Sequence, residues 1–122
     1  MLKGLGTDII EIARVRTAIS RHRHHFLDKL FSKTEQEYCN KYNDPVPHYA
    51  GRFAAKEAIA KAIGTGFITG LSWLDIEILN DAYGKPIVKL SEQLQDNIGA
   101  GKIMLSISHC KSYATATAVL LS

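Results

Sequence analysis

The chain has 122 residues, of which 46% are hydrophobic and 22% are charged, and its formal net charge is +3. This length suits one domain with a single core, and the composition excludes a disordered or fibrous protein. No run approaches the roughly 18 apolar residues of a membrane-spanning helix, and no basic segment with a long apolar run opens the chain. We therefore expect one domain over residues 1–122, located in the cytoplasm and without a membrane partner.

The first predicted element is a short strand at residues 2–10, in which glycines recur at alternate positions. Alternate residues of a strand share a face, so Gly4, Gly6 and Asp8 point to the same side. Glycine weakens a strand interior and is typical of a place where a ligand or another backbone comes close. The pattern predicts a bare face that ends in a carboxylate.

Two helical segments are predicted next, at about residues 12–30 and 32–42. The second begins with Ser32-x-x-Glu35, the pattern of a capping box. A loop is expected at residues 43–47, because proline lacks a backbone donor and restricts the residue before it.

Positive charge is concentrated in the first of these helices. Residues 14–29 hold five basic side chains and one acid, while the rest of the chain is close to neutral. Three histidines in the same segment add charge in mildly acidic conditions. An acidic partner is the natural inference. The basic residues and the histidines are Arg14, Arg16, Arg21, His22, Arg23, His24, His25 and Lys29.

The remaining elements mix a long helix with paired strands. A helix is predicted from about residue 49 to 62 or 63, closed by Gly64 in a left-handed conformation. Extended patterns at 74–78 and 87–88 flank a turn at 80–84, which is typical of a hairpin.

A short helix at about 91–98 and two extended runs, 103–108 and 113–121, complete the chain. Three alanines share one face of the last run, which suits close packing. They are Ala114, Ala116 and Ala118. Helices combined with antiparallel strand pairs predict an α+β fold.

The segment GRFAAKEAIAKAIGTG, residues 51–66, carries the most informative polar side chains. Glu57 and Lys61 lie one helical turn apart, the spacing of an ordinary surface ion pair. If the bare strand face meets the alanines of this helix, the carboxylates of Asp8 and Glu57 converge. Two like charges about 4 Å apart repel each other by roughly 4 kcal/mol at an effective dielectric of about 20. A proton or a cation must relieve that repulsion, and two carboxylates with water are typical ligands of Mg²⁺. Both interpretations are open at this point.

Glycines and a histidine give weaker signals for phosphate binding. Gly64 and Gly66 follow a helix, whose C-terminal end carries negative partial charge and repels anions. Phosphate binding there would need the side chain of Lys61 or Arg52. His109 suits either a hydrogen-bonded structural role or a contact to a phosphate or a reacting proton.

Five stretches match a known family in the same order along nearly the whole chain: GLGTDIIEIARV, FSKTE, GRFAAKEAIAKAIGTG, NDAYGKP and SISHCKSYATA. The chain resembles the bacterial holo-acyl-carrier-protein synthases, the small trimeric class of 4′-phosphopantetheinyl transferases. The specific part is Asp8 in the glycine strand together with Lys56, Glu57 and Lys61 in the alanine-rich helix.

The resemblance implies a transfer of the 4′-phosphopantetheine arm of coenzyme A to a serine of apo acyl carrier protein, with release of adenosine 3′,5′-bisphosphate, in fatty acid biosynthesis. It implies that Asp8 and Glu57 bind Mg²⁺ and that Lys61 stabilises negative charge on the phosphates. Arg52 and His109 would contact the coenzyme A nucleotide from the same or a neighbouring subunit. The proton of the serine would pass either to Glu57 or to a water in the metal's shell.

The family resemblance also implies a homotrimer with sites between subunits. In such a trimer the glycine face and the alanine face would find partners. Arg14, Arg21 and Arg23 fall where the basic first helix of the family docks the acidic carrier protein.

Two other function classes compete with this one. A nucleic-acid-binding module on the basic helix would need zinc-ligand spacing or an aromatic and basic strand motif, and the sequence has neither. A noncatalytic coenzyme-A-binding or structural trimer would leave the pair of Asp8 and Glu57 unexplained. We therefore expect an enzyme without a nucleic-acid partner.

Overall fold

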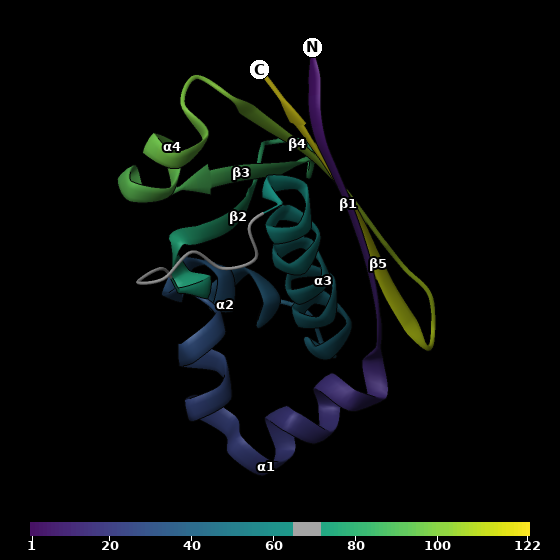
Figure 1. The fold of residues 1–122 in the computed structure, drawn as a ribbon. Helices are drawn as coiled ribbons and strands as arrows, with labels where there is room; N and C mark the ends of the chain where they lie inside the picture. The colour runs from purple at the N-terminus through teal and green to yellow at the C-terminus, as the bar shows by residue number, and fades with distance from the viewer. Residues whose placement is uncertain (65–71) are drawn as a thin grey trace.

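A single helix, α3 (Val46–Ile63), lies between two groups of elements in this computed structural model, which describes residues 1–64 and 72–122. On one side is a three-stranded antiparallel sheet in the order β1-β5-β4, and on the other are α2 and the β2–β3 hairpin (Figure 1). The sheet strands are β1 (Leu2–Glu11), β4 (Lys102–His109) and β5 (Tyr113–Leu121). The α+β class predicted from the sequence is confirmed.

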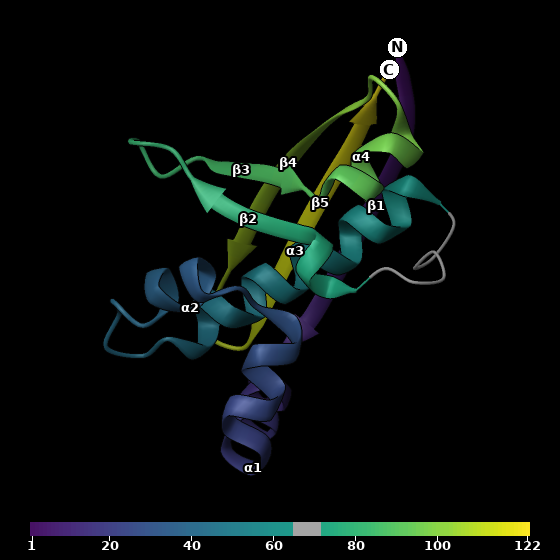
Figure 2. The ribbon, with the colours of Figure 1, turned by 90° about the vertical axis from the view of Figure 1, so that its left-hand side faces the viewer.

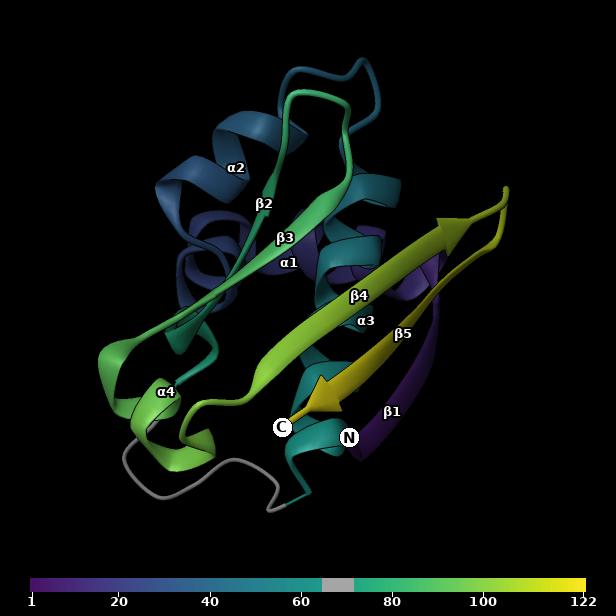
Figure 3. The same cartoon turned by 90° about the horizontal axis from the view of Figure 1, so that it is seen from above.

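The second sheet is a hairpin of β2 (Ile76–Asn80) and β3 (Pro86–Leu90), preceded by the 3₁₀ turn η1 (Trp73–Asp75). The β3 strand passes beside β4, and α4 (Glu92–Ile98) connects the two (Figures 2 and 3). The strand predicted at 74–78 therefore begins later, because its first two residues form the 3₁₀ turn.

Helix α1 (Ile12–Leu30) continues directly from β1 and extends away from the sheet (Figure 1). Its backbone breaks at Arg23, which has a φ of +42°. Helix α2 (Lys33–Cys39) is shorter than predicted. Its predicted capping box is present, since Ser32 Oγ accepts from the Glu35 amide and the Glu35 carboxylate accepts from the Ser32 amide.

Helix α3 begins at Val46, three residues before the predicted start, and α2 ends at Cys39, so the connecting loop lies at residues 40–45 rather than 43–47. Pro47 lies in the first turn, where a backbone N–H has no partner within the helix and its loss costs nothing. The end of the helix agrees with the prediction, because Gly64 takes the left-handed conformation with a φ of +89°.

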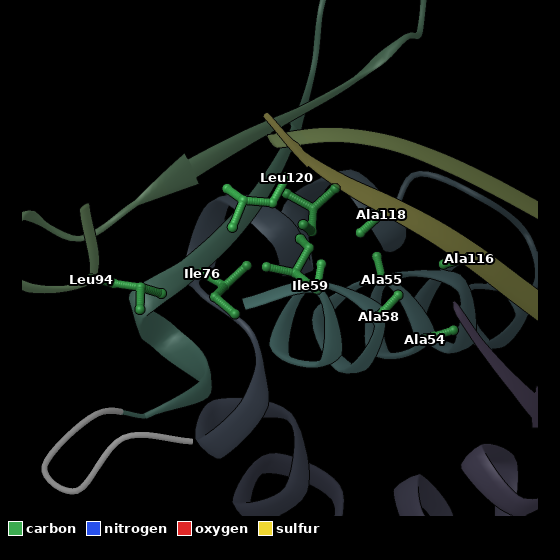
Figure 4. Packing of buried hydrophobic residues seen from close by; sticks show 11 residues of the cluster. Ala54, Ala55, Ala58, Ile59, Ile76, Leu94, Ala116, Ala118 and Leu120 are labelled. Atoms are coloured by element: carbon green, nitrogen blue, oxygen red, sulfur yellow. The ribbon is translucent and has the colours of Figure 1, made fainter. Parts of the chain in front are cut away.

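The bare face of β1 packs directly on α3. A Cβ on Gly4 would lie 2.0 Å from the Ala62 carbonyl oxygen, and one on Gly6 would lie 1.9 Å from that of Ala58. Glycine is thus required because two backbones meet, one of the two explanations that the sequence offered. The alanine face of β5 is also buried against α3 (Figure 4). Placing these two faces in contact with other subunits was wrong, because α3 of the same chain covers both.

The core has two parts that meet along α3. The first lies between α3, the sheet and the hairpin, and includes Ile59, Ile76 and Leu120 (Figure 4). The second joins α1 and α2 to the first half of α3, where the Phe31 and Tyr49 rings lie 5.0 Å apart. No helix in the described ranges is long and apolar enough to cross a membrane.

Candidate active site

The contact between β1 and α3 brings together the charged residues that the sequence singled out. Lys61 Nζ donates to Asp8 Oδ1 at 3.2 Å and to the Thr7 carbonyl oxygen at 3.0 Å. Glu57 lies one turn earlier on α3. Burial, and next the negative charge of Asp8, raise the pKa of the Glu57 carboxyl, while Lys61 opposes them. The glycines let β1 approach the helix closely enough for Asp8 to meet Lys61 and for its charge to act on Glu57.

The chemistry of these donors suits a hard divalent cation. Two carboxylates and a backbone carbonyl offer only oxygen ligands, the kind that Mg²⁺ prefers. The raised pKa of Glu57 means that burial and the charge of Asp8 disfavour the ionised carboxylate. A cation bound between the two carboxylates would favour the ionised form again. In the described parts of the chain, no group of three or more His, Cys, Asp or Glu side chains could hold a metal.

The side chain of Arg52 extends from α3 toward α2 and β2, while that of Lys61 extends toward β1. Its guanidinium lies 4.1 Å from the centre of the Tyr38 ring and donates to Asn80 Oδ1. Arg52 is only 4% exposed, and its Nε has no hydrogen-bond partner among the described residues. It borders an open hollow of about 320 Å³ that Lys41 also lines. Two cations beside a hollow, one with an unused donor, suit an anionic ligand.

His109 lies at the end of β4 and its ring meets that of His48, with 5.4 Å between centroids. The pKa of His48 is lowered by burial first and then by the positive charges of His109 and Arg52. Because the charges of both Arg52 and His109 lower the pKa of His48, these two residues lie close to the same ring. The structure thus groups Arg52 with His109 through His48, and Lys61 with Asp8 and Glu57 where β1 packs on α3.

The basic residues predicted to meet an acidic carrier are exposed on α1. Arg14, Arg21 and Arg23 have solvent-exposed side chains, whereas Arg16 is paired with Asp44 at 2.8 Å. Helix α1 begins four residues after Asp8.

The sequence also singled out two glycines after α3 and a lysine within it, namely Gly64, Gly66 and Lys56. A Cβ on Gly64 would have open space around it among the described residues, and Gly66 lies outside them. Lys56, which the sequence marked only as part of a signature, is fully buried. Its ammonium donates to Glu35 at 2.8 Å and to the Leu30 carbonyl at 2.6 Å, so it joins the end of α1 and the start of α2 to α3.

Sequence reasoning missed the aromatic residues beside Arg52 and His109. Tyr38 and Tyr42 are one helical turn apart and share a hydrogen bond between hydroxyls at 3.1 Å, and His48 stacks on Tyr42. The spacing of the two tyrosines was the available signal. Their position beside Arg52 and His109 depends on how α2, α3 and β4 pack.

Comparison with known proteins agrees with this architecture. The family model for the 4′-phosphopantetheinyl transferase superfamily matches residues 4–118. The chain is 54% identical over 119 residues to the holo-acyl-carrier-protein synthase of Protochlamydia amoebophila, covering 98% of each chain. It is 51% identical over 118 residues to that of Chlamydia pneumoniae, covering 97% of this chain and 96% of the relative.

Solved structures of the same enzyme class have the same fold. The Helicobacter pylori holo-acyl-carrier-protein synthase in complex with coenzyme A matches with a TM-score of 0.88 and 34% identity, over 96% of this chain and 99% of that one. The Bacillus anthracis enzyme, in complex with coenzyme A (3′,5′-ADP), matches with a TM-score of 0.83 and 38% identity, over 98% and 96%. The chain therefore belongs to the 4′-phosphopantetheinyl transferase superfamily, among the enzymes of the holo-acyl-carrier-protein synthase kind.

Proposed function

We propose that this enzyme transfers the 4′-phosphopantetheine arm of coenzyme A to a serine of apo acyl carrier protein, in the cytoplasm and in the service of fatty acid biosynthesis. The observation that carries the proposal is the meeting of Asp8, Glu57 and Lys61 where β1 packs on α3. The composition of this site suits a reaction at a pyrophosphate, because it can hold a divalent cation and place an ammonium beside it.

In this reaction the serine oxygen attacks the β-phosphorus of the pyrophosphate. A new P–O bond forms to the serine, the bond to the bridging oxygen breaks, and adenosine 3′,5′-bisphosphate leaves. Mg²⁺ held by Asp8 and Glu57 would neutralise charge on the phosphate oxygens. Lys61 would move from Asp8 toward the phosphates, where its ammonium stabilises the charge that develops on the leaving group.

Either Glu57 or a water in the metal's shell would take the proton of the serine. Such proton transfer contributes about 10²–10⁴-fold to a rate. Arg52 and His109 would bind the nucleotide part of coenzyme A, and Arg14, Arg21 and Arg23 would bind the acidic carrier.

We further propose a homotrimer in which each site is completed by a neighbouring subunit. Within one chain the side chain of Arg52 extends from α3 toward Asn80 on β2 and that of Lys61 toward Thr7 on β1, and a ligand that needs both would lie between two chains. The outer face of the sheet supports this arrangement, because Leu5 and Ile9 are 64% and 66% exposed there and Met104 lies in the same row as Leu5. Apolar side chains exposed together on a sheet are typical of an interface.

A transfer assay tests the proposal. The chain is incubated with apo acyl carrier protein, coenzyme A and Mg²⁺, and the mass of the carrier is measured. We expect the carrier to gain the phosphopantetheine arm, and a chelator to stop the gain until Mg²⁺ is restored. Coenzyme A binding without any gain in carrier mass would favour a noncatalytic protein, and transfer unchanged by chelator would overturn the metal site.

A further inference from the structure

We propose that Tyr42 and His48 are positioning residues that fix His109 relative to Arg52 in the nucleotide-binding half of the site. The inference rests on the proposed function, since it concerns how the same enzyme holds coenzyme A. It assigns a role to two residues that contribute no predicted contact with the substrate themselves.

The first observation is a stacked pair of rings. Tyr42, in the turn after α2, and His48, in the first turn of α3, lie with centroids 3.5 Å apart and planes inclined by 14°. Such close and nearly parallel stacking fixes both rings, and His48 is half-buried while Tyr42 remains exposed. The pair therefore joins the turn at residue 42 to the start of α3.

The second observation is that this pair has a predicted nucleotide contact at each end. On one side the ring of His109 meets the His48 ring edge to face, at 5.4 Å and 76°. On the other side the hydroxyl of Tyr42 shares a hydrogen bond with that of Tyr38, whose ring face carries the Arg52 guanidinium at 4.1 Å. A continuous row of contacts thus runs from the cation on α3 to the histidine at the end of β4.

The charges along the row explain why a histidine is suitable at position 48. Its neighbours are His109 from β4, Arg52 from α3, Asp44 from the preceding loop and Tyr38 and Tyr42 from the α2 side. Burial first, and then the positive charges of His109 and Arg52, lower the pKa of His48 and favour its neutral imidazole, while Asp44 opposes them. A neutral ring adds no repulsion against the Arg52 guanidinium, so His48 acts through its shape.

Fixing the two cations in advance lowers the cost of binding a nucleotide. Ordering a side chain on binding costs about 0.5–1.5 kcal/mol, and His109 is exposed at the end of its strand. Loss of the stack should therefore raise KM for coenzyme A by roughly two- to tenfold, which is that cost converted to a ratio. The rate at saturating coenzyme A and the KM for the carrier protein should not change.

The experiment compares His48→Ala, His48→Phe and Tyr42→Leu in the full chain. His48→Ala and Tyr42→Leu should raise KM for coenzyme A, whereas His48→Phe keeps a stacking ring and should restore the KM of the original chain. Tyr83→Ala removes an aromatic ring that is 96% exposed on the β2–β3 turn and is the control for surface changes. Tyr42 is exposed, so its variant remains informative if His48→Ala does not fold.

Two readouts separate positioning from a merely structural role. The ¹H–¹³C NMR signal of the His109 ring should shift in His48→Ala and stay near its original place in His48→Phe. Calorimetric titration with adenosine 3′,5′-bisphosphate measures nucleotide binding without the transfer reaction. We expect weaker binding by His48→Ala and unchanged binding by His48→Phe.

The outcomes distinguish this inference from the proposed function. If the original chain transfers the arm but His48→Ala and Tyr42→Leu bind coenzyme A and the nucleotide as before, the positioning role is overturned and the function stands. If the original chain transfers nothing but binds the nucleotide in a manner that depends on the ring at position 48, the function fails and the positioning role stands. Equal losses in His48→Phe and His48→Ala, or no nucleotide binding at all, would overturn it.

Discussion

At the scale of single residues, Glu57 is a side chain whose surroundings do not favour folding stability. Its carboxyl is partly buried near Asp8, and both conditions raise its pKa. A bound cation or proton relieves the repulsion between the two carboxylates, and without either the repulsion lowers the stability of the chain. The proposed role in binding and catalysis therefore accounts for Glu57 better than a contribution to stability does.

Replacement of Glu57 by Gln should separate these two contributions. We expect turnover to fall by about 10²–10⁴-fold, because a charged ligand and a base are lost. The melting temperature should be unchanged or higher, since the amide is not repelled by Asp8. Steady-state kinetics and thermal melts on the same samples measure both quantities, with Glu92→Gln on the exposed face of α4 as the control. A large drop in melting temperature with normal turnover would contradict a role in the site.

His48 provides a prediction on pH. Its pKa in the folded chain is lowered, chiefly by burial, so the folded state binds a proton less readily than the unfolded chain. The stability that this gives is complete above the ordinary histidine pKa of about 6.5 and is lost as the pH falls through the folded value. The free energy of unfolding of the original chain, measured in urea, should therefore decrease more between pH 7 and pH 5 than that of His48→Phe. Parallel curves would show that His48 does not titrate differently in the folded chain.

At the scale of elements, the contact between β1 and α3 decides whether Asp8 can reach Glu57. Gly6→Ala should cost about 1–3 kcal/mol of unfolding free energy, because its Cβ would meet the Ala58 carbonyl oxygen, which cannot move without disturbing the helix.

Gly51→Ala is the matched control for this substitution. Its added Cβ would lie 3.0 Å from a methyl group of Ile107, which can shift, and alanine favours a helix by about 1 kcal/mol over glycine. Chemical denaturation compares the two variants. Equal stabilities would mean that β1 does not depend on glycine to approach α3.

Helix α1 carries the prediction on the partner. Arg14→Glu or Arg21→Glu should raise KM for the carrier protein by roughly 1.4- to fivefold for each residue, because exposed ion pairs contribute about 0.2–1 kcal/mol. KM for coenzyme A should stay constant, and added salt should reduce the difference. Lys89→Glu, an exposed reversal on β3, is the control. A parallel rise of KM for both substrates would argue against docking on α1.

The elements differ in how much the sequence could predict. The glycine face of β1 and the capping box of α2 follow from residues close in sequence, so their patterns were sufficient. The break at Arg23 was not predictable from the pattern of its helix. The row from Tyr38 to His109 was also missed, since it joins three elements whose packing no local pattern specifies.

The site as a whole was predicted only in part, for the same reason. Spacing placed Glu57 and Lys61 on one face of a helix. Their meeting with Asp8 required that the glycine face of β1 pack on the alanines of α3, and the sequence could state this only as a condition. Arg52 was expected beside a phosphate, and its burial between Tyr38 and Asn80 could not be read from the helix in which it lies.

At the scale of the whole molecule, the proposed sharing of each site between two chains of a trimer can be tested by mixing variants. Asp8→Asn removes a carboxylate and His109→Ala removes a nucleotide contact, so each variant alone should be inactive or strongly impaired. In mixed trimers some sites combine the intact Asp8 of one chain with the intact His109 of another. We expect a mixture refolded from equal amounts to recover about a quarter of the original transfer activity, which is the share of such sites in a cyclic trimer.

The control for this experiment is a mixture of Asp8→Asn with Glu57→Gln, which lie in the same half of the site. That mixture should stay inactive, because no pairing restores both carboxylates in one chain. Activity in neither mixture would mean that each chain holds a complete site, and a monomer by light scattering would overturn the trimer itself.

The buried contact of Lys56 with Glu35 limits how this sequence can change over evolutionary time. Removing either charge alone leaves the other stranded without water, which costs about 3–5 kcal/mol, a large part of the stability of a small domain. Replacing both with apolar side chains would also strand the Leu30 carbonyl and the Ser32 and Ile78 amides, which bond to Lys56 and Glu35. The two positions are therefore constrained together with the backbone groups around them, and a lineage that leaves this pair must supply new partners for those groups as well.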